Sequence, residues 1–130
     1  FRIDPNGAKD PLKKMLLQPL VENAIYHGIK EKEGIGKICV GSRCFEHATA
    51  YFIYDDGIGM HPARVQELNE QMKSRDEIVQ QHMGLSNANL RLKLAYGEKA
   101  RIHIKSKEGV YTLIYFFVER SGVCDACPPQ

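Results

Sequence analysis

The 130-residue sequence lacks the features that would place it in a membrane or on nucleic acid. It has no apolar run approaching the roughly 20 residues that span a bilayer, and its first residues do not resemble a signal peptide. No basic run stands out, and 18 basic against 16 acidic residues leave a net charge of only +2. This near-balance gives no reason to expect a nucleic-acid partner. If the parent protein meets a membrane, segments outside this chain make that contact.

The four cysteines do not predict a disulfide framework. Cys39 and Cys44 fall in one strand-like run, where about 3.3 Å per residue separates them by roughly 16 Å, too far for a bridge. Cys124 and Cys127 form C-D-A-C, a spacing found in redox pairs and in half a zinc site, but no second such pair is present. We interpret them as incidental residues of a C-terminal tail, 121–130, and expect a reduced, cytoplasmic setting.

The composition is that of a folded domain, because 43% of the residues are hydrophobic and 26% are charged. One core suffices at this length, so we expect a single domain over residues 1–120. Helices are expected over residues 11–26, 62–72 and 85–96. Strands are expected over residues 36–45, 48–56, 100–107 and 110–120, after a short strand near the N-terminus. The last strand is apolar on both faces and is expected at the sheet centre. Helices on one side of a mostly antiparallel sheet make a two-layer α/β sandwich.

Several residues mark where the helices begin and end. Asp10 followed by Pro11 is typical of an N-cap and a first helical position. Pro19 removes a backbone donor, so we expect a kink or a restart there. Gly28 and Gly97 are expected to end the first and the third helix.

The first helix carries polar residues on the stripe that it uses for packing. Its apolar residues recur at helical spacing: Leu12, Met15, Leu16, Leu20 and Ala24. Steps of three and four residues continue this stripe to Asn23 and His27. A buried polar group without a partner costs about 1–3 kcal/mol. Taken alone, the pattern is explained by Asn23 capping a neighbouring loop and His27 hydrogen-bonded in the core, so this helix does not decide between packing and a site.

Two glycine motifs follow. In DDGIGM, residues 55–60, a strand ends in a carboxylate, and Gly57 and Gly59 permit positive φ angles and a close approach of a ligand to the main chain. The motif alone is weak, since many tight turns contain it, and a calcium loop is disfavoured because oxygen ligands at EF-hand spacing are missing. In HMGLSNANLRL, residues 82–92, Gly84 directly precedes a helix, an arrangement that binds phosphate through free N–H groups.

Together, and in this order, the three segments are specific. An asparagine-bearing helix, a strand ending in DxGxG and a glycine that opens a later helix resemble the ATP-binding fold of histidine kinases, gyrase, Hsp90 and MutL, the Bergerat fold. Within that superfamily, QPLVENAIYHG with GLSNANLRLKLAYG looks like the catalytic domain of LytS/YesM-type bacterial sensor histidine kinases. The resemblance covers roughly residues 3–120.

The resemblance implies ATP and Mg²⁺ as ligands. Asn23 matches the family's magnesium-binding asparagine, a neutral oxygen ligand that leaves the ion free to bridge phosphates. Asp55 matches the aspartate that accepts a hydrogen bond from the adenine amine, where guanine would present an oxygen instead. Gly57, Gly59 and Met60 match the motif that lies beside the base.

The phosphate-binding part departs from the family pattern. Gly84 and Leu85 match the second glycine box, whose backbone faces the phosphates, but one of its two usual glycines is missing. Asn87 and Arg91 match the helix that follows, although a solvated charge is the alternative to a phosphate contact for Arg91. The segment 73–83 is polar and has no clean period, so we expect a lid that is mobile without nucleotide.

The catalytic positions differ as well. Many histidine kinases carry a lysine three residues after the asparagine, where this chain has Tyr26, so we expect His27 to take over its phosphate contact. ATPases of the superfamily activate water with a glutamate four residues before the asparagine, and Pro19 stands there instead. Glu22 lies about 100° around the helix from Asn23 and is expected to orient or activate an attacking histidine. This pattern favours transfer over hydrolysis.

The resemblance also implies partners. The segment that carries the acceptor histidine in the family is absent, and none of the five histidines has that context. We therefore expect the ATP-binding half of a kinase, acting on a phosphoacceptor histidine in a separate dimerisation segment and, through the full-length protein, on a cognate response regulator. The parent protein is expected to be anchored in the cell membrane, with this domain in the cytoplasm. A GHKL-type ATPase and a non-catalytic nucleotide-sensing module are the alternatives.

Overall fold

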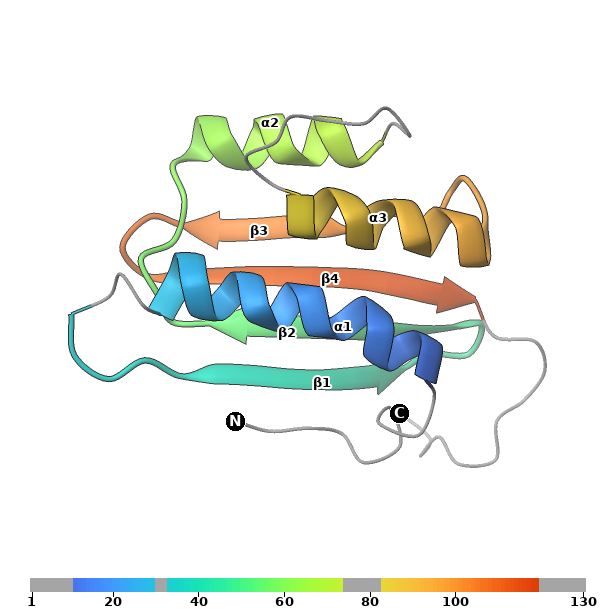
Figure 1. Cartoon of the computed structure of the whole chain (residues 1–130), viewed down its shortest axis with the longest axis horizontal. Helices are drawn as coiled ribbons and strands as arrows, with labels where there is room; N and C mark the ends of the chain where they lie inside the picture. Colours follow the sequence, from blue (N-terminus) through green and yellow to red (C-terminus); the bar gives the residue numbers. More distant parts are fainter. Residues whose placement is uncertain (1–10, 30–32, 74–82, 120–130) are drawn as a thin grey trace.

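An antiparallel sheet with helices on one face forms the part of the protein that the computed structural model describes, residues 11–29, 33–73 and 83–119 (Figure 1). For residues 11–14 and 83 the structure describes the backbone but not the side chains. The helical elements are α1 (Pro11–Asn23), a π-helical turn η2 (Ala24–Ile29), α2 (Pro62–Met72) and α3 (Met83–Tyr96). The strands are β1 (Ile38–Cys44), β2 (Ala48–Asp55), β3 (His103–Lys107) and β4 (Tyr111–Glu119).

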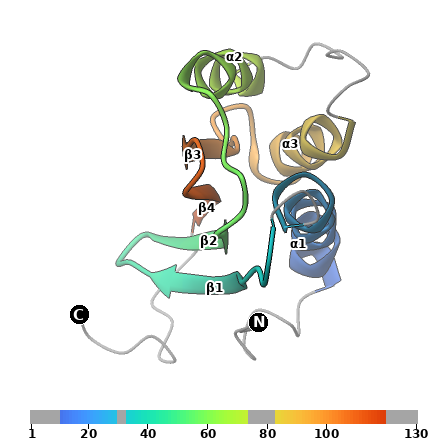
Figure 2. The same cartoon turned by 90° about the vertical axis from the view of Figure 1, so that its left-hand side faces the viewer.

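The strands lie in the order β1-β2-β4-β3, and each neighbouring pair in the described part is antiparallel. Figure 2 shows α1 and α3 over one face of the sheet and α2 beside β3, at the sheet edge. The expected two-layer sandwich of helices and a mostly antiparallel sheet is confirmed. The expected central position of the last strand is also confirmed, since β4 pairs with β2 on one side and β3 on the other.

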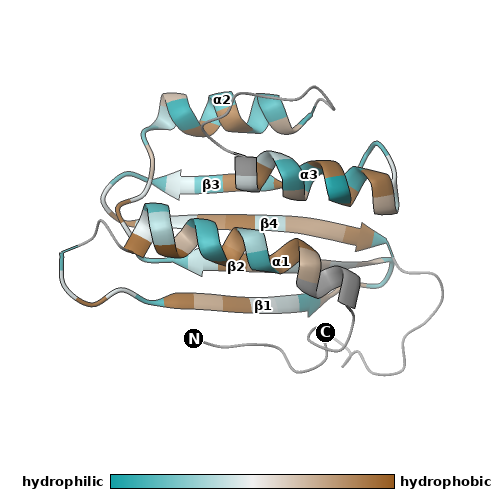
Figure 3. Cartoon of the chain, in the orientation of Figure 1, coloured by the Kyte–Doolittle hydropathy of each residue, from teal (hydrophilic) through white to brown (hydrophobic). Residues whose placement is uncertain are grey.

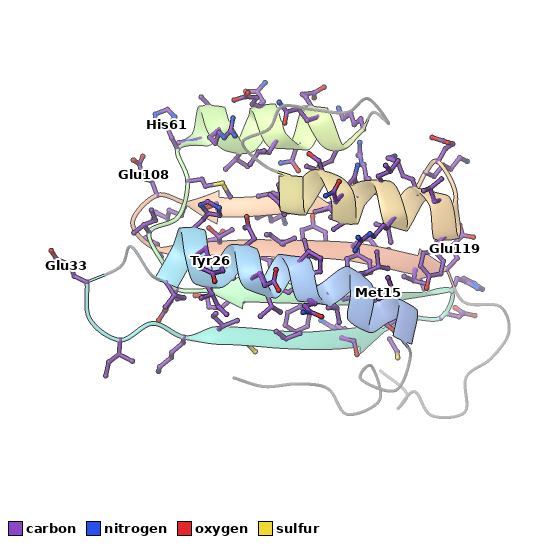
Figure 4. All side chains as sticks on the ribbon, in the orientation of Figure 1. Met15, Tyr26, Glu33, His61, Glu108 and Glu119 are labelled. Carbon is purple, nitrogen blue, oxygen red and sulfur yellow. The ribbon has the colours of Figure 1, made fainter. Side chains whose placement is uncertain are left out.

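The core lies between the sheet and the helices. Helix α1 contributes Leu16 and Leu20, and Ala24, the first residue of η2, continues their four-residue spacing; all three side chains are almost fully buried. Figure 3 shows apolar residues along α1 and along β4. Met15, which the sequence placed on the same stripe, is 54% exposed, so that expectation is wrong (Figure 4). The side chain of Leu12 lies outside the described residues.

Helix ends follow the local signals closely in two places. Helix α2 has the predicted bounds, and its N-cap His61 accepts a hydrogen bond through Nδ1 from the N–H of Ala63 at 3.1 Å. Helix α3 begins at Met83 and ends before Gly97, which has a φ of 105° and donates its N–H to the carbonyl of Lys93 at 2.8 Å. A glycine in this left-handed conformation is the usual way to end a helix.

The first helix departs from expectation. It runs through Pro19 without a restart and then widens into the π-helical turn η2. Gly28 does not end it in a left-handed conformation: it is buried inside η2, and its φ is not among the positive ones. The expected C-terminal role of Gly28 is therefore wrong, and its actual contact is with Asp55.

Other expectations fall outside the described residues. These are the N-cap Asp10, the first short strand, most of the lid at 73–83, and the tail 121–130 with Cys124 and Cys127. In the described part, Cys39 is a free thiol, which agrees with the absence of a bridge to Cys44. None of the described helices is long and apolar enough to cross a membrane.

Candidate functional site

The candidate site is built around Asp55, the last residue of the central strand β2. Its side chain is almost completely buried, with 2% of its surface exposed. The N–H of Gly57 donates to Oδ1 of this carboxylate at 3.0 Å. Among the described residues, no other group donates a hydrogen bond to this carboxylate. A buried acidic group with so few donors is costly, which marks it as a candidate binding group rather than a packing residue.

Gly28 of η2 lies directly against this carboxylate. A Cβ at Gly28 would come within 2.5 Å of Oδ1 of Asp55 and 2.9 Å of its Cγ. A Cβ at Gly57 would in turn fall on the backbone carbonyl of Gly28, and that carbonyl accepts the N–H of Ile58 at 3.3 Å. The end of the first helical segment and the DxGxG loop are therefore in backbone contact, which only glycine permits at both positions.

The charge state of Asp55 is tuned by this burial. Desolvation raises the pKa of the Asp55 carboxyl above its ordinary value of 3.8, the N–H of Gly57 opposes the rise, and the neighbouring Asp56 carboxylate adds to it. Because the carboxylate is held short of donors, a ligand that offers an N–H to it gains more than it would at the surface.

The rest of the loop is anchored to the turn between β3 and β4. Gly59 has a φ of 67°, and a Cβ there would fall on the carbonyl of Lys107. The N–H of Gly109 donates to the carbonyl of Ile58 at 2.6 Å, and the N–H of Met60 donates to Oγ of Ser106 at 2.8 Å. The missing side chain at Gly59 thus makes room for protein backbone, and the predicted space beside a base at this position stays a prediction.

Asn23 and His27 lie where α1 gives way to η2. Asn23 is half-buried, and its side-chain amide makes no hydrogen bond within the described part of the chain. His27 is exposed, so a core position for it is wrong. The reason is the π-helical turn, whose wider hydrogen-bonding pattern interrupts the 3.6-residue period. Glu22 is exposed too and accepts a hydrogen bond from Nε2 of Gln18 at 3.4 Å.

The predicted residues of α3 lie on its first turns. Gly84 is exposed and is the second residue of the helix, so it does not precede the helix as expected. Its nearest neighbour is α1, since a Cβ there would meet the carbonyl of Pro19 at 3.9 Å. Leu85 is buried in the core, whereas Asn87 and Arg91 are exposed. The nucleotide contacts of these α3 residues stay predictions.

One polar residue beside Asp55 escaped the sequence reasoning. Thr112 of β4 lies directly opposite Asp55 in the strand register and is 6% exposed. Its hydroxyl is 3.0 Å from Oγ of Ser106. The signal was present, because Thr112 interrupts an otherwise apolar strand, but its partner in the register could not be known.

Comparisons with known proteins agree with this arrangement. The sequence model of the family described as "Histidine kinase-, DNA gyrase B-, and HSP90-like ATPase" matches residues 8–122. The chain belongs to this family. Within the family, it corresponds to the catalytic ATP-binding domain of a sensor histidine kinase.

Two curated relatives carry kinase names. An uncharacterized sensor-like histidine kinase of Staphylococcus epidermidis is 36% identical over 103 residues, 79% of this chain and 20% of that protein. The sensor protein kinase HptS of Staphylococcus aureus is 34% identical over 108 residues, 83% of this chain and 20% of that protein. The chain thus spans about a fifth of the length of these relatives.

Solved structures support the fold. The catalytic domain of histidine kinase ThkA aligns with a TM-score of 0.56 at 18% identity, covering 82% of this chain and 66% of that one. The histidine kinase domain of the blue-light activated kinase of Erythrobacter litoralis aligns with a TM-score of 0.55 at 16% identity, covering 82% of this chain and 45% of that one. At these identities the likeness shows the fold of the histidine-kinase-type domain.

Substituting Gly28 tests the contact between η2 and Asp55. We expect Gly28→Ala to lower the free energy of unfolding by about 1–3 kcal/mol, because the added methyl overlaps a buried carboxylate that Gly57 holds in place. Thermal or urea denaturation measures the loss. The control is Gly84→Ala. A Cβ at this helical position has open space around it, so the substitution should not destabilise the domain. Equal stability of the two variants would contradict the contact.

The raised pKa of Asp55 predicts a pH dependence. A carboxyl whose pKa is higher in the folded state binds its proton more tightly there, so the stability that it contributes falls as pH rises from its unfolded value through the raised one. Above this window the ionised group destabilises the nucleotide-free domain. Asp55→Asn, which keeps an acceptor for the N–H of Gly57, should flatten this part of the pH profile and raise the melting temperature at neutral pH. Calorimetric scans of both proteins across this pH range measure the change in melting temperature. A melting temperature of Asp55→Asn below that of the unsubstituted chain at neutral pH would contradict the prediction.

Proposed function

We propose that this domain binds ATP with Mg²⁺ and supports transfer of the γ-phosphoryl group to a histidine that lies outside this chain. The observation that carries the proposal is the buried Asp55 carboxylate, held by a single described N–H at the junction of η2 and the DxGxG loop. The family membership, the fold and the names of the relatives support the same reading.

In this proposal, the Asp55 carboxylate recognises the adenine base of the nucleotide. With Oδ1 engaged by Gly57, the carboxylate still has acceptor capacity for the exocyclic amine of adenine. A guanine base would bring a carbonyl oxygen to the same place and be repelled. Thr112, buried opposite Asp55, is a second polar group that this pocket offers.

The residues near the end of α1 fit a magnesium-bound phosphate chain. A Mg²⁺ ion bound with nucleotide takes most of its ligands from phosphates and water, so one or two protein oxygens suffice. The half-buried amide of Asn23, without a hydrogen bond in the described part, fits this requirement. When bound, the ion neutralises charge that develops on the transferred group. His27, exposed beside it, is the proposed phosphate contact in place of the family's lysine.

Transfer and hydrolysis differ in the group that receives the phosphoryl group, which is a histidine in the first and water in the second. Pro19 occupies the position of the water-activating glutamate, and it is half-buried in α1 with no group that could act as a base. Glu22 is exposed on the same helix, where a protein segment that docks there could meet it. We propose that Glu22 orients or activates the attacking histidine.

The partners belong to the proposal as well. The acceptor histidine is proposed to lie in a dimerisation segment of the parent protein, and the full-length kinase is proposed to pass the phosphoryl group to a cognate response regulator. The parent is proposed to be anchored in a membrane by segments outside this chain. The relatives of five times this length, both named as sensor kinases, support this context.

Calorimetric titration tests the binding step. ATP should bind the domain with Mg²⁺ present and more weakly after chelation, and GTP should bind more weakly than ATP. Release of phosphate by the isolated domain, without any transfer when the acceptor fragment is added, would favour a GHKL-type ATPase. The absence of nucleotide binding would favour an interaction module.

A further inference from the structure

A hollow of about 250 Å³ lies between the last turn of α2 and the start of β3. Its lining combines the end of α2 with one edge of the sheet: Asn69, Glu70, Lys73, Arg101, His103 and Tyr115 among others. The end of α2 and the start of β3 lie toward one end of the sheet, while η2 and the end of β2 lie toward the other (Figure 1). The hollow is therefore separate from the Asp55 site.

The hollow is electropositive. Three cationic side chains line it, Lys73, Arg101 and Lys105, against the single carboxylate of Glu70. That carboxylate forms its ion pair with Nζ of Lys73 at 2.8 Å, and this bond, more than the nearby Arg101, lowers the pKa of Glu70. Lys105 is exposed, and Arg101 is half-buried and makes no hydrogen bond or ion pair within the part of the chain that the structure describes. A partly desolvated guanidinium that no carboxylate of the described residues pairs directly favours binding an anion.

The floor of the hollow is aromatic. His103 stacks on Tyr115 with ring centroids 5.0 Å apart and planes 14° from parallel, and Nζ of Lys105 lies 5.9 Å from the centre of the Tyr115 ring. Burial, and then the charge of Arg101, lower the pKa of His103, so the imidazole stays neutral at neutral pH and the positive charge comes from the lysines and the arginine.

The wall on the α2 side is closed by hydrogen bonds. The side-chain amide of Asn69 donates to the carbonyl of Ile104 at 2.9 Å and accepts its N–H at 2.9 Å. Asn69 therefore occupies the outward-facing backbone groups of Ile104 on the edge strand, and an added β-strand could not pair there. A side chain that enters the hollow, rather than a strand laid along the edge, fits this surface.

We propose that this hollow binds a carboxylate side chain of an acidic protein segment, with Arg101 as its main contact. The planar guanidinium matches a carboxylate in two parallel hydrogen bonds, and Lys105 adds a second charge. The stacked rings of His103 and Tyr115 offer an apolar surface beside it for a ring or a methylene chain of the same segment. The charge of the hollow, rather than its small volume, selects an acidic protein partner.

Peptide binding to the ¹⁵N-labelled 130-residue chain tests the proposal. The probe is a capped five-residue peptide with four acidic residues around one phenylalanine, and its counterpart carries amides in place of the four carboxylates. The acidic peptide should shift the amide signals around Arg101 and Tyr115 in a saturable manner, and the amide peptide should not. Arg101→Gln should weaken the acidic peptide about tenfold, as expected for a hydrogen bond to a charged group.

Two further variants make the result specific. Lys105→Gln, at an exposed position, should also weaken binding of the peptide. Lys99→Gln removes an exposed charge outside the hollow and should change the affinity less than about twofold. Equal losses in Lys99→Gln and Arg101→Gln would overturn the proposal, since they indicate unspecific attraction. Shifts caused equally well by inorganic phosphate, or no saturable shift at all, would overturn it too. Arg101→Gln should bind ATP with the affinity of the unsubstituted chain. If the peptide does not bind, the proposed nucleotide site at Asp55 is therefore unaffected by that result.

Discussion

Asp55→Asn is expected to narrow the preference for ATP over GTP, and not merely to weaken nucleotide binding. The substitution keeps the size of the side chain but replaces a buried carboxylate, which accepts from adenine, with an amide that presents either a donor or an acceptor. ATP should lose about 1.5–3 kcal/mol, the range for a hydrogen bond to a charged group. GTP should lose little, because it has no favourable contact there. Competition binding of the two nucleotides measures the ratio.

The control for this experiment is Asp56→Asn. Asp56 is the next residue, and its carboxylate accepts the N–H of Lys37 at 2.7 Å, so an asparagine removes the same charge one position away from the base. It should leave the ratio of ATP to GTP affinity nearly unchanged. If Asp55 were instead a structural residue that caps its own turn through Gly57, both nucleotides would weaken in parallel and the melting temperature would fall. An unchanged ratio in a thermally intact Asp55→Asn protein would refute the adenine contact.

Asn23→Ala is expected to weaken Mg²⁺-dependent ATP binding and to abolish phosphoryl transfer while leaving the fold intact. Loss of a direct metal ligand should lower transfer at least about 100-fold, the upper end of what loss of an outer-shell partner costs. The fold should survive because the half-buried amide makes no hydrogen bond in the described part, so its removal leaves no orphaned partner there. Transfer assays over a range of Mg²⁺ concentrations measure the loss, and circular dichroism melting curves check the fold.

Gln18→Ala is the matched control, since it removes an exposed amide from the same helix α1. It should bind ATP and Mg²⁺ as the unsubstituted chain does. Unchanged transfer by Asn23→Ala at saturating ATP and low Mg²⁺ would remove Asn23 from the metal site. A melting temperature that falls in Asn23→Ala alone would point to a packing role instead.

The sequence predicted what depends on neighbours along the chain. Pro62 at the start of α2 and Gly97 after α3 act within one helical turn, and both ends were located to within a residue or so. The apolar character of β4 on both faces predicted a central strand, and β4 does lie between β2 and β3, although the described helices cover only one face of the sheet. Asp55 at the end of β2 was found for the same reason, as a carboxylate closing an apolar run.

What the sequence could not give depends on contacts between distant residues. Gly28 looked like a helix end, and only the fold shows that it is small because the Asp55 carboxylate lies against it, 27 positions later in the chain. His27 appeared to continue the buried stripe, but the stripe assumes an α-helical period that η2 breaks. Gly59 predicted room for a ligand, and only the fold shows that a side chain there would also meet the backbone of the β3–β4 turn.

Transfer of label from γ-labelled ATP to a fragment of the parent protein that carries the acceptor histidine tests the central proposal most directly. The account predicts that the 130-residue chain with Mg²⁺ labels the fragment through an acid-labile, alkali-stable bond, as a phosphorylated histidine gives, and that an acceptor fragment with alanine in place of that histidine stays unlabelled. The label appearing only as free phosphate, with the fragment unlabelled while ATP binds normally, would contradict the account and assign the domain to hydrolysis.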